Sequence, residues 1–292
     1  MFFLSFDWIK RFPQTVKYGE TLNNEFTNDY QAVTVIVPCF NCEGTIEKSI
    51  ESVMDQTRKP VKIILVEDKS TDGTKKILRK IKQRWAVVVD IELFEMEKNL
   101  GLSAVRNFAL ERASTPWVAL LDSDDCWSPT KLEKQLEAVE TFNVSFCGTC
   151  DNRKSRKYNQ VEEPFSWITA DDILKKSQFG ASSFLFRKND VRFWNKPIED
   201  GEFAIKYLIT NSSNSSRAIR INQPLTIYPR EGVNLGGLTG KIFQMTMARH
   251  SLLYRYFFST EKSPAICLVG MVINLVKLPL RFLRKWYLVL TQ

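Results

Sequence analysis

The stretch VALLDSDDCW, residues 118–127, places three carboxylates directly after an apolar run. The apolar residues indicate a buried strand, and Asp122, Asp124 and Asp125 follow where that strand ends. Like charges at this spacing repel and raise one another's pKa, so a positive partner is expected. A hard divalent metal ion takes oxygen ligands, and we therefore predict a metal site at these three residues. The alternative is a solvated acidic turn.

Strands and helices alternate around this stretch for about 120 residues, which is typical of an α/β domain with a mainly parallel sheet. One-faced apolar periodicity between the apolar runs predicts the helices. Ligands of such sheets bind at the carboxyl ends of the strands, where Asn41, Asp68 and the acidic stretch all lie. Topology alone therefore predicts a site at that edge. The runs that predict buried strands are residues 32–38, 61–68, 86–94 and 116–122.

After residue 151 the alternation loosens, and shorter elements are expected. A further helix and strand, residues 129–142 and 144–150, precede this region. The later expected elements are a short strand at 182–187, a helix at 199–209, an edge strand at 218–221, and helices at about 239–258 and 264–290.

Composition and missing motifs exclude several classes of protein. The 292 residues carry a net charge of +8, but no element in the first 260 residues interleaves basic and aromatic side chains, so no nucleic acid is expected as partner. The G-x-G-x-x-G motif is absent, which argues against a Rossmann dinucleotide site. The G-x-x-x-x-G-K-[ST] motif is also absent, which argues against a P-loop. Two C-x-x-C pairs lie about a hundred residues apart, so reduced thiols are expected rather than a zinc ribbon. The first residues lack the charged region and cleavage site of a signal peptide, so a cytoplasmic location is expected.

Two classes of enzyme place D-x-D after a buried strand. In haloacid-dehalogenase-like phosphatases the motif normally opens the fold, whereas here it follows the fourth strand and continues with Asp125 and Cys126. The other class is the nucleotide-sugar glycosyltransferases of the GT-A fold. From Val33 to Ile209 the chain resembles their family 2, although Glu67 replaces a usual Asp and Val105 a common Ala. The stretches that carry the resemblance are VTVIVPCFNCEGTIEKSIESVMDQT, ILVEDKSTDGT, NLGLSAVRNFAL, LLDSDD and IEDGEFAIKYL.

The resemblance implies a GT-A fold, with a mainly parallel Rossmann-like sheet flanked by helices and followed by a helical tail. Residues 1–30 show no clear period and are expected to form an N-terminal arm, followed by a catalytic domain at 31–230 and a tail at 231–292. Within the catalytic domain, residues 31–150 would form the nucleotide-binding half and residues 151–230 the acceptor half.

The resemblance also assigns roles to single residues of the donor site. Asp122 and Asp124 would hold the ribose and a Mn²⁺ or Mg²⁺ ion that bridges the diphosphate, with Asp125 nearby. Asp68 would accept a hydrogen bond from a uracil or thymine base, its alternative role being a turn or cap residue. Arg106 would reach the phosphates, or else be a charge on the helix surface. The residues that would line the nucleotide pocket are Pro38, Phe40, Asn41 and Glu43.

For the reaction, Asp200 is the family-matched general base, and plain helix capping is its alternative role. One base opposite the leaving group implies a single displacement with inversion. The Q-x-x-R-W motif of processive synthases is absent, since only KQRW occurs at residues 82–85, so transfer of one sugar is expected. The acceptor would be a hydroxyl of a glycan or of a lipid-linked acceptor, as in bacterial surface polysaccharide synthesis. The alternative function is a non-catalytic sugar- or lipid-binding relative.

The C-terminal tail carries a pattern of its own. An apolar run at 265–276 is shorter than the roughly 20 residues of a membrane span. Lys277, Arg281, Arg284 and Lys285 then fall on one helical face beside aromatic residues. We therefore expect the tail to dock on the anionic inner surface of a membrane. The alternative is a terminal helix that packs on the catalytic domain or on another subunit.

Overall fold

A computed structural model describes residues 31–152, 163–194, 199–210, 217–228, 242–257, 268 and 271–272. The predicted arm at 1–30 lies outside the described residues. The first half of the domain contains β1 (Val33–Cys39), α2 (Ile46–Met54), β2 (Lys62–Glu67), α3 (Thr74–Trp85), β3 (Asp90–Glu95), α4 (Leu102–Arg112), β4 (Trp117–Leu120), β5 (Cys126–Trp127), α5 (Lys131–Thr141) and β6 (Phe146–Asp151). The second half contains β7 (Phe165–Thr169), α7 (Ala170–Lys175), the 3₁₀ turn η3 (Ala181–Ser183), β8 (Leu185–Arg187), α8 (Glu199–Thr210), β9 (Arg217–Ile227) and α9 (Ile242–Phe257).

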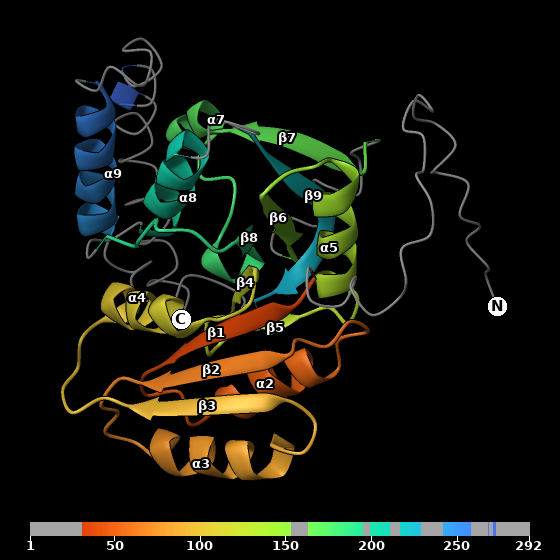
Figure 1. The fold of residues 1–292 in the computed structure, drawn as a ribbon. Helices are drawn as coiled ribbons and strands as arrows, with labels where there is room; N and C mark the ends of the chain where they lie inside the picture. The colour runs from red at the N-terminus through yellow and green to blue at the C-terminus, as the bar shows by residue number, and fades with distance from the viewer. Residues whose placement is uncertain are drawn as a thin grey trace, which may run out of the picture.

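One mixed sheet organises the molecule, with strand order β3-β2-β1-β4-β8-β6-β9-β5 and with β7 also paired to β9 (Figure 1). Strands β3, β2, β1 and β4 are parallel, as the sequence predicts. Strand β8 then runs antiparallel to both β4 and β6. The parallel half brings the carboxyl ends of β1, β2 and β4 to one edge, because parallel strands all end on the same side.

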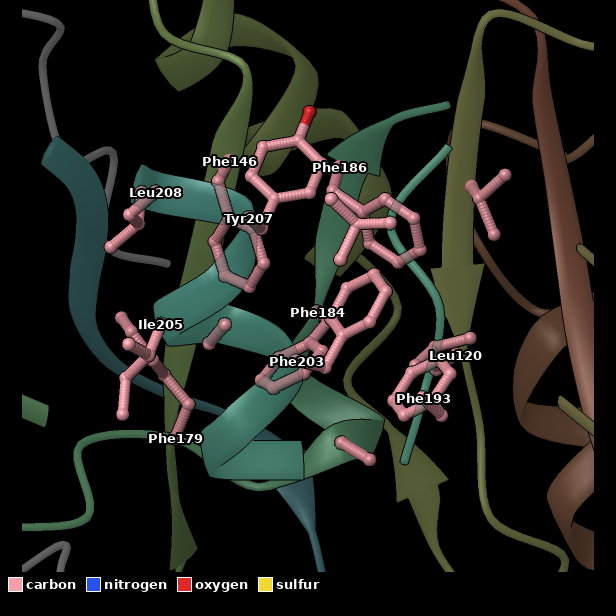
Figure 2. Close-up of a cluster of buried hydrophobic side chains, with 14 of the residues drawn as sticks. Leu120, Phe146, Phe179, Phe184, Phe186, Phe193, Phe203, Ile205, Tyr207 and Leu208 are labelled. Carbon is pink, nitrogen blue, oxygen red and sulfur yellow. The ribbon is translucent and has the colours of Figure 1, made fainter. Parts of the chain in front are cut away.

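Two hydrophobic cores lie on the two faces of this sheet. Apolar side chains of α2, α3 and α5 belong to one core, and those of α4, α7, α8 and α9 belong to the other. The second core holds an aromatic cluster in which the ring of Phe146 contacts Phe184, Phe186 and Tyr207 (Figure 2). This cluster joins β6 and β8 to α8, and so anchors the helix that begins at Glu199.

Three predicted strands differ from the structure. The strand predicted at 182–187 is shorter, because residues 182–183 belong to the 3₁₀ turn η3 and the strand β8 begins at Leu185. Residues 86–89 do not belong to the third strand: they form the turn after α3, where Val87 is 92% exposed, and β3 begins at Asp90. The backbone N–H of Val89 bonds to the carbonyl of Trp85, which holds this turn against the helix end. The predicted edge strand at 218–221 lies inside the sheet, because β9 pairs with β6 on one side and with β7 and β5 on the other.

The first predicted helix of the tail is confirmed as α9, which lies beside α7 and α8 (Figure 1). Arg249 donates to the carbonyls of Ile173 and Leu174 at the end of α7, and Arg255 forms an ion pair with Glu202 of α8 at 2.9 Å. The predicted basic face of the tail lies outside the described residues. Within the described ranges, no helix combines the length and the apolar character that crossing a bilayer requires.

Candidate active site

The acidic stretch folds into a tight turn at the carboxyl end of β4. The backbone N–H of Leu121 bonds to the carbonyl of Ile36 at 3.0 Å, which sets the turn beside the end of β1. Within the turn, the N–H of Asp125 bonds to the carbonyl of Asp122 at 3.0 Å. The side chains of Asp122 and Asp124 are half-buried, whereas Asp125 is buried. The three carboxylates therefore have different surroundings.

Ser182, in the 3₁₀ turn before β8, supports this acidic turn from the second half of the domain. Its hydroxyl donates to Asp125 Oδ2 at 2.5 Å and accepts a hydrogen bond from the backbone N–H of Asp122 at 3.0 Å. The carbonyl of Ser182 also accepts from the indole of Trp127 at 2.8 Å. Asp125 is thus satisfied from inside the protein, and its carboxylate faces Ser182.

Arg106 of α4 lies at the centre of the site and is almost completely buried, at 1% exposure. Its guanidinium donates to Asp122 at 2.6 Å and to Glu199 at 3.0 Å. Burial alone would lower the pKa of Arg106, but the charges of Asp122 and Glu199 outweigh it and raise the pKa. The alternative of a charge on the helix surface is therefore wrong. Arg106 Nε is buried and makes no hydrogen bond to the described residues, and contact with the phosphates stays a prediction.

Glu199 and Asp200 are the first two residues of α8, and Glu199 is paired with Arg106. Burial, with the neighbouring charge of Asp200, raises the pKa of Glu199 to about 7, although Arg106 opposes the shift. Burial also raises the pKa of Asp200, against the opposing effects of the Gly201 N–H and Arg106. Asp200 Oδ1 accepts that N–H at 2.7 Å. A helix-capping carboxylate would instead accept the N–H of a residue two or three positions further along. The site thus contains a carboxyl pair whose protons are held more tightly than usual.

Asp68 follows β2 at the same edge and is buried. Its two carboxylate oxygens accept the backbone N–H groups of Leu100 and Gly101 at 2.6 and 2.9 Å. Gly101 has a φ of 84°, a conformation that suits glycine, and it directly precedes α4. Asp68 therefore fixes the loop that begins α4, and each oxygen has capacity for a further hydrogen bond.

The predicted nucleotide residues after β1 lie in a turn that is tied to the turn after β2. Asn41 Oδ1 accepts the N–H of Thr71 at 2.8 Å, and Glu43 accepts the N–H of Gly73 at 2.6 Å. Pro38 is buried at the end of the strand, whereas the ring of Phe40 is 49% exposed. Phe40 is thus the member of this group that presents an open face.

The carboxylates at this edge of the sheet could hold a divalent cation only as a small set of ligands. Among the described residues, no three His, Cys, Asp or Glu side chains gather into a cluster that would hold a metal. Two half-buried carboxylates, Asp122 and Asp124, nevertheless suit Mg²⁺ or Mn²⁺, because such ions are commonly held by one or two carboxylates together with substrate phosphates. Asp122 and Asp124 therefore suit an ion that also binds the phosphates of a diphosphate substrate.

Two parts of this arrangement were not predicted from the sequence. Ser182 carries no signal in its local pattern, since it lies in an unremarkable polar pair. Glu199 is next to the predicted base, but its bond to Arg106 joins residues 93 positions apart. The helical spacing of Arg106 alone gives no indication of that partner.

The sheet and its helix layers have the GT-A fold. The chain belongs to glycosyl transferase family 2, whose family model matches residues 34–207. It is 39% identical over 218 residues to the putative teichuronic acid biosynthesis glycosyltransferase TuaG of Bacillus subtilis, covering 65% of this chain and 84% of TuaG. It is 36% identical over 175 residues to the Escherichia coli UDP-Glc:alpha-D-GlcNAc-diphosphoundecaprenol beta-1,3-glucosyltransferase WfaP, covering 59% of this chain and 67% of WfaP.

Solved structures show the same fold at lower identity. S. aureus TarS 1–349 in complex with UDP-GlcNAc superposes with a TM-score of 0.64 at 18% identity, over 83% of this chain and 72% of that one. The Pyrobaculum calidifontis mannosyltransferase PcManGT, in complex with GDP-Man and Mn²⁺, superposes with a TM-score of 0.62 at 20% identity. The match covers 84% of this chain and 69% of PcManGT. Against a longer TarS structure the match spans 43% of that chain.

Proposed function

We propose that the protein transfers one sugar from a nucleoside-diphosphate sugar to a hydroxyl of a glycan or lipid-linked acceptor, with inversion and with a divalent metal. One observation carries this proposal. Buried Arg106 binds Asp122 of the acidic turn and Glu199 beside Asp200, so it brings the donor-side and acceptor-side carboxylates together. Enzymes that transfer sugars by direct displacement need such groups on both sides of the reacting carbon.

Asp200 takes the proton of the acceptor hydroxyl in this proposal. The hydroxyl oxygen forms a bond to the anomeric carbon while the bond from that carbon to the diphosphate breaks, and one displacement inverts the configuration. Burial raises the pKa of Asp200 above its usual value, and a carboxylate with a raised pKa is a stronger base than an ordinary aspartate. Glu199 holds the Arg106 guanidinium beside Asp200, which offsets part of the negative charge of the two carboxylates.

Asp122 and Asp124 are the residues that would hold Mn²⁺ or Mg²⁺. When bound, the ion would neutralise charge that develops on the departing diphosphate. Asp122 itself is oriented by Arg106 and by the Ser182 hydroxyl on its backbone N–H. We assign Asp125 to supporting the turn, because its carboxylate is buried against Ser182.

The donor carries uridine or thymidine diphosphate in this proposal. Asp68 has lone pairs left for the imide N–H that both pyrimidines present, and the exposed ring of Phe40 offers a face for the base. Pro38, Asn41 and Glu43 complete the pocket by holding the two turns together. The named donor of WfaP is UDP-glucose, which agrees with this choice, whereas PcManGT was solved with GDP-mannose.

The relatives and the tail support the proposed acceptor and location. WfaP and WfgD are named for acceptors linked to diphosphoundecaprenol, and TuaG for teichuronic acid biosynthesis. A lipid-linked acceptor lies at a membrane surface, and the basic tail at 277–285 would bring the enzyme to the cytoplasmic face of that membrane. We accordingly divide the chain into an arm (1–30), a catalytic domain (31–230) and a docking tail (231–292).

The test is a panel of nucleotide sugars incubated with Mn²⁺, lipid-linked acceptors and either wild type or Asp200→Asn. The asparagine keeps the shape of Asp200 but removes its basicity, so turnover should fall by about 10² or more while donor affinity stays the same. NMR of the product should show inversion at the anomeric carbon. Retained configuration, or a collapse of donor binding without loss of rate, would refute these roles.

A further inference from the structure

Helix α4 presents three polar side chains, Ser103, Arg106 and Asn107, to the segment that precedes α8. Their spacing of three and four residues puts them on one helical face. Ser103 Oγ donates to the carbonyl of Trp194 at 2.8 Å. Asn107 donates to the carbonyl of Phe193 at 2.9 Å and accepts its N–H at 2.8 Å. We call Phe193 and Trp194 the 193–194 segment.

The amide of Asn107 satisfies both backbone groups of one residue in the 193–194 segment, as a neighbouring strand would do. On its other side, the ring of Phe193 stacks on Phe203 of α8, with centroids 4.1 Å apart and planes 7° from parallel (Figure 2). The guanidinium of Arg106 also lies over the Phe193 ring at 5.2 Å. The 193–194 segment is therefore held between α4 and the first turns of α8, where Asp200 lies.

The same helix is also fixed to the donor side. The N–H of Gly101, the residue before α4, binds Asp68, and Arg106 of α4 binds Asp122. A helix keeps its residues at fixed spacing, so α4 determines the distance between the donor groups and the 193–194 segment. Catalysis is sensitive to that distance, since a displacement of about 1 Å can reduce the rate on the order of 10²-fold.

We propose that Ser103 and Asn107 are positioning residues, which set Asp200 against the anomeric carbon through the 193–194 segment. This inference rests on the proposed function, because it requires Asp200 to be the base. Neither residue touches the substrate in this proposal, so their loss should lower turnover and leave nucleotide affinity unchanged.

A double-mutant cycle tests the proposal. Turnover is measured for Asn107→Ala in the wild-type and Asp200→Asn backgrounds, and Kd for UDP is measured by calorimetry with Mn²⁺. The control is Glu111→Ala, an exposed residue of the same helix. If Asn107 acts through Asp200, its substitution should lower turnover by about 10-fold or more in wild type but by less than about 2-fold in Asp200→Asn.

Two results would overturn the proposal: losses that multiply across the cycle, or turnover of Asn107→Ala that equals that of Glu111→Ala. If thermal unfolding shows that Asn107→Ala is not folded, Ser103→Ala is taken through the same cycle, because this substitution removes only one hydrogen bond. Full turnover of Asp200→Asn would refute the proposed base itself. An inactive Asp200→Asn with a multiplicative cycle would refute only the positioning role.

Discussion

Lys131 is a fully buried lysine, and its replacement should change how the stability of the protein depends on pH. The side chain has 0% exposure, lies 4.0 Å from the ring centroid of Trp127, and donates to Gln135 at 2.7 Å. No carboxylate among the described residues forms an ion pair with it. Burial lowers the pKa of Lys131 from 10.5 to about 7, and the slight opposing influence of Cys147 does not offset this.

The sign and size of the effect follow from that pKa. Between about pH 7 and pH 10.5 the unfolded chain binds a proton at Lys131 that the folded chain lacks, so stability rises with pH in this window. Below about pH 7 both states are protonated, and the folded state bears the full cost of the buried charge, about 5 kcal/mol. From pH 7 to pH 9 the gain in stability is about 2 kcal/mol.

Lys131→Met removes this pH-dependent contribution. The variant leaves Gln135 Oε1 without its donor, which lowers the free energy of unfolding by about 1–3 kcal/mol. This loss is the same at every pH, so it does not affect how the stability difference changes with pH. Urea unfolding at pH 7, 8 and 9 gives the free energy of unfolding of each protein. The advantage of Lys131→Met over wild type should shrink by about 2 kcal/mol across the series. The control is Lys134→Met, whose ammonium bonds to Gln223 at the surface and whose effect should be flat. A constant difference between wild type and Lys131→Met would refute the reasoning.

Three further predictions concern the site and the tail. Asp124→Ala should abolish transfer while the melting temperature holds, and full activity in EDTA or in this variant would contradict the metal role. Calorimetry with Mn²⁺ should rank UDP or dTDP above GDP, and tightest binding of GDP would overturn the assignment of Asp68. In flotation with anionic vesicles, full-length protein should float and release at high salt, whereas a chain ending near Ser263 should stay behind; equal behaviour of the two would remove the docking role of the tail.

The parallel half of the sheet could be predicted because strands buried on both faces leave unbroken apolar runs in the sequence. The same signal misplaced the third strand, since residues 86–89 are apolar yet form a largely exposed turn. The position of β9 inside the sheet could not be predicted, because β9 pairs with β6 and β7, which lie far from it in the sequence.

The site shows the same limit. Five motifs in order indicated the family and the edge of the sheet where the site lies, and the family match and the solved neighbours agree with them. Which carboxylate has which partner depends on contacts between distant residues: Arg106 with Glu199, and Asp125 with Ser182. Such contacts leave no trace in local spacing, so the burial of Arg106 could not be predicted.

The acidic turn after β4 raises the question of what balances its charge, and the answer lies in three different environments. Asp122 is paired with Arg106, which it shares with Glu199, and Asp125 is satisfied by the hydroxyl of Ser182. One guanidinium therefore serves two carboxylates, while Asp124 and Asp200 add further negative charge at the same edge. A diphosphate would bring still more negative charge to that edge, which Arg106 is too buried to offset. Productive donor binding therefore calls for a cation that arrives with the nucleotide, and this is the physical reason to expect metal dependence from a site with so few protein ligands.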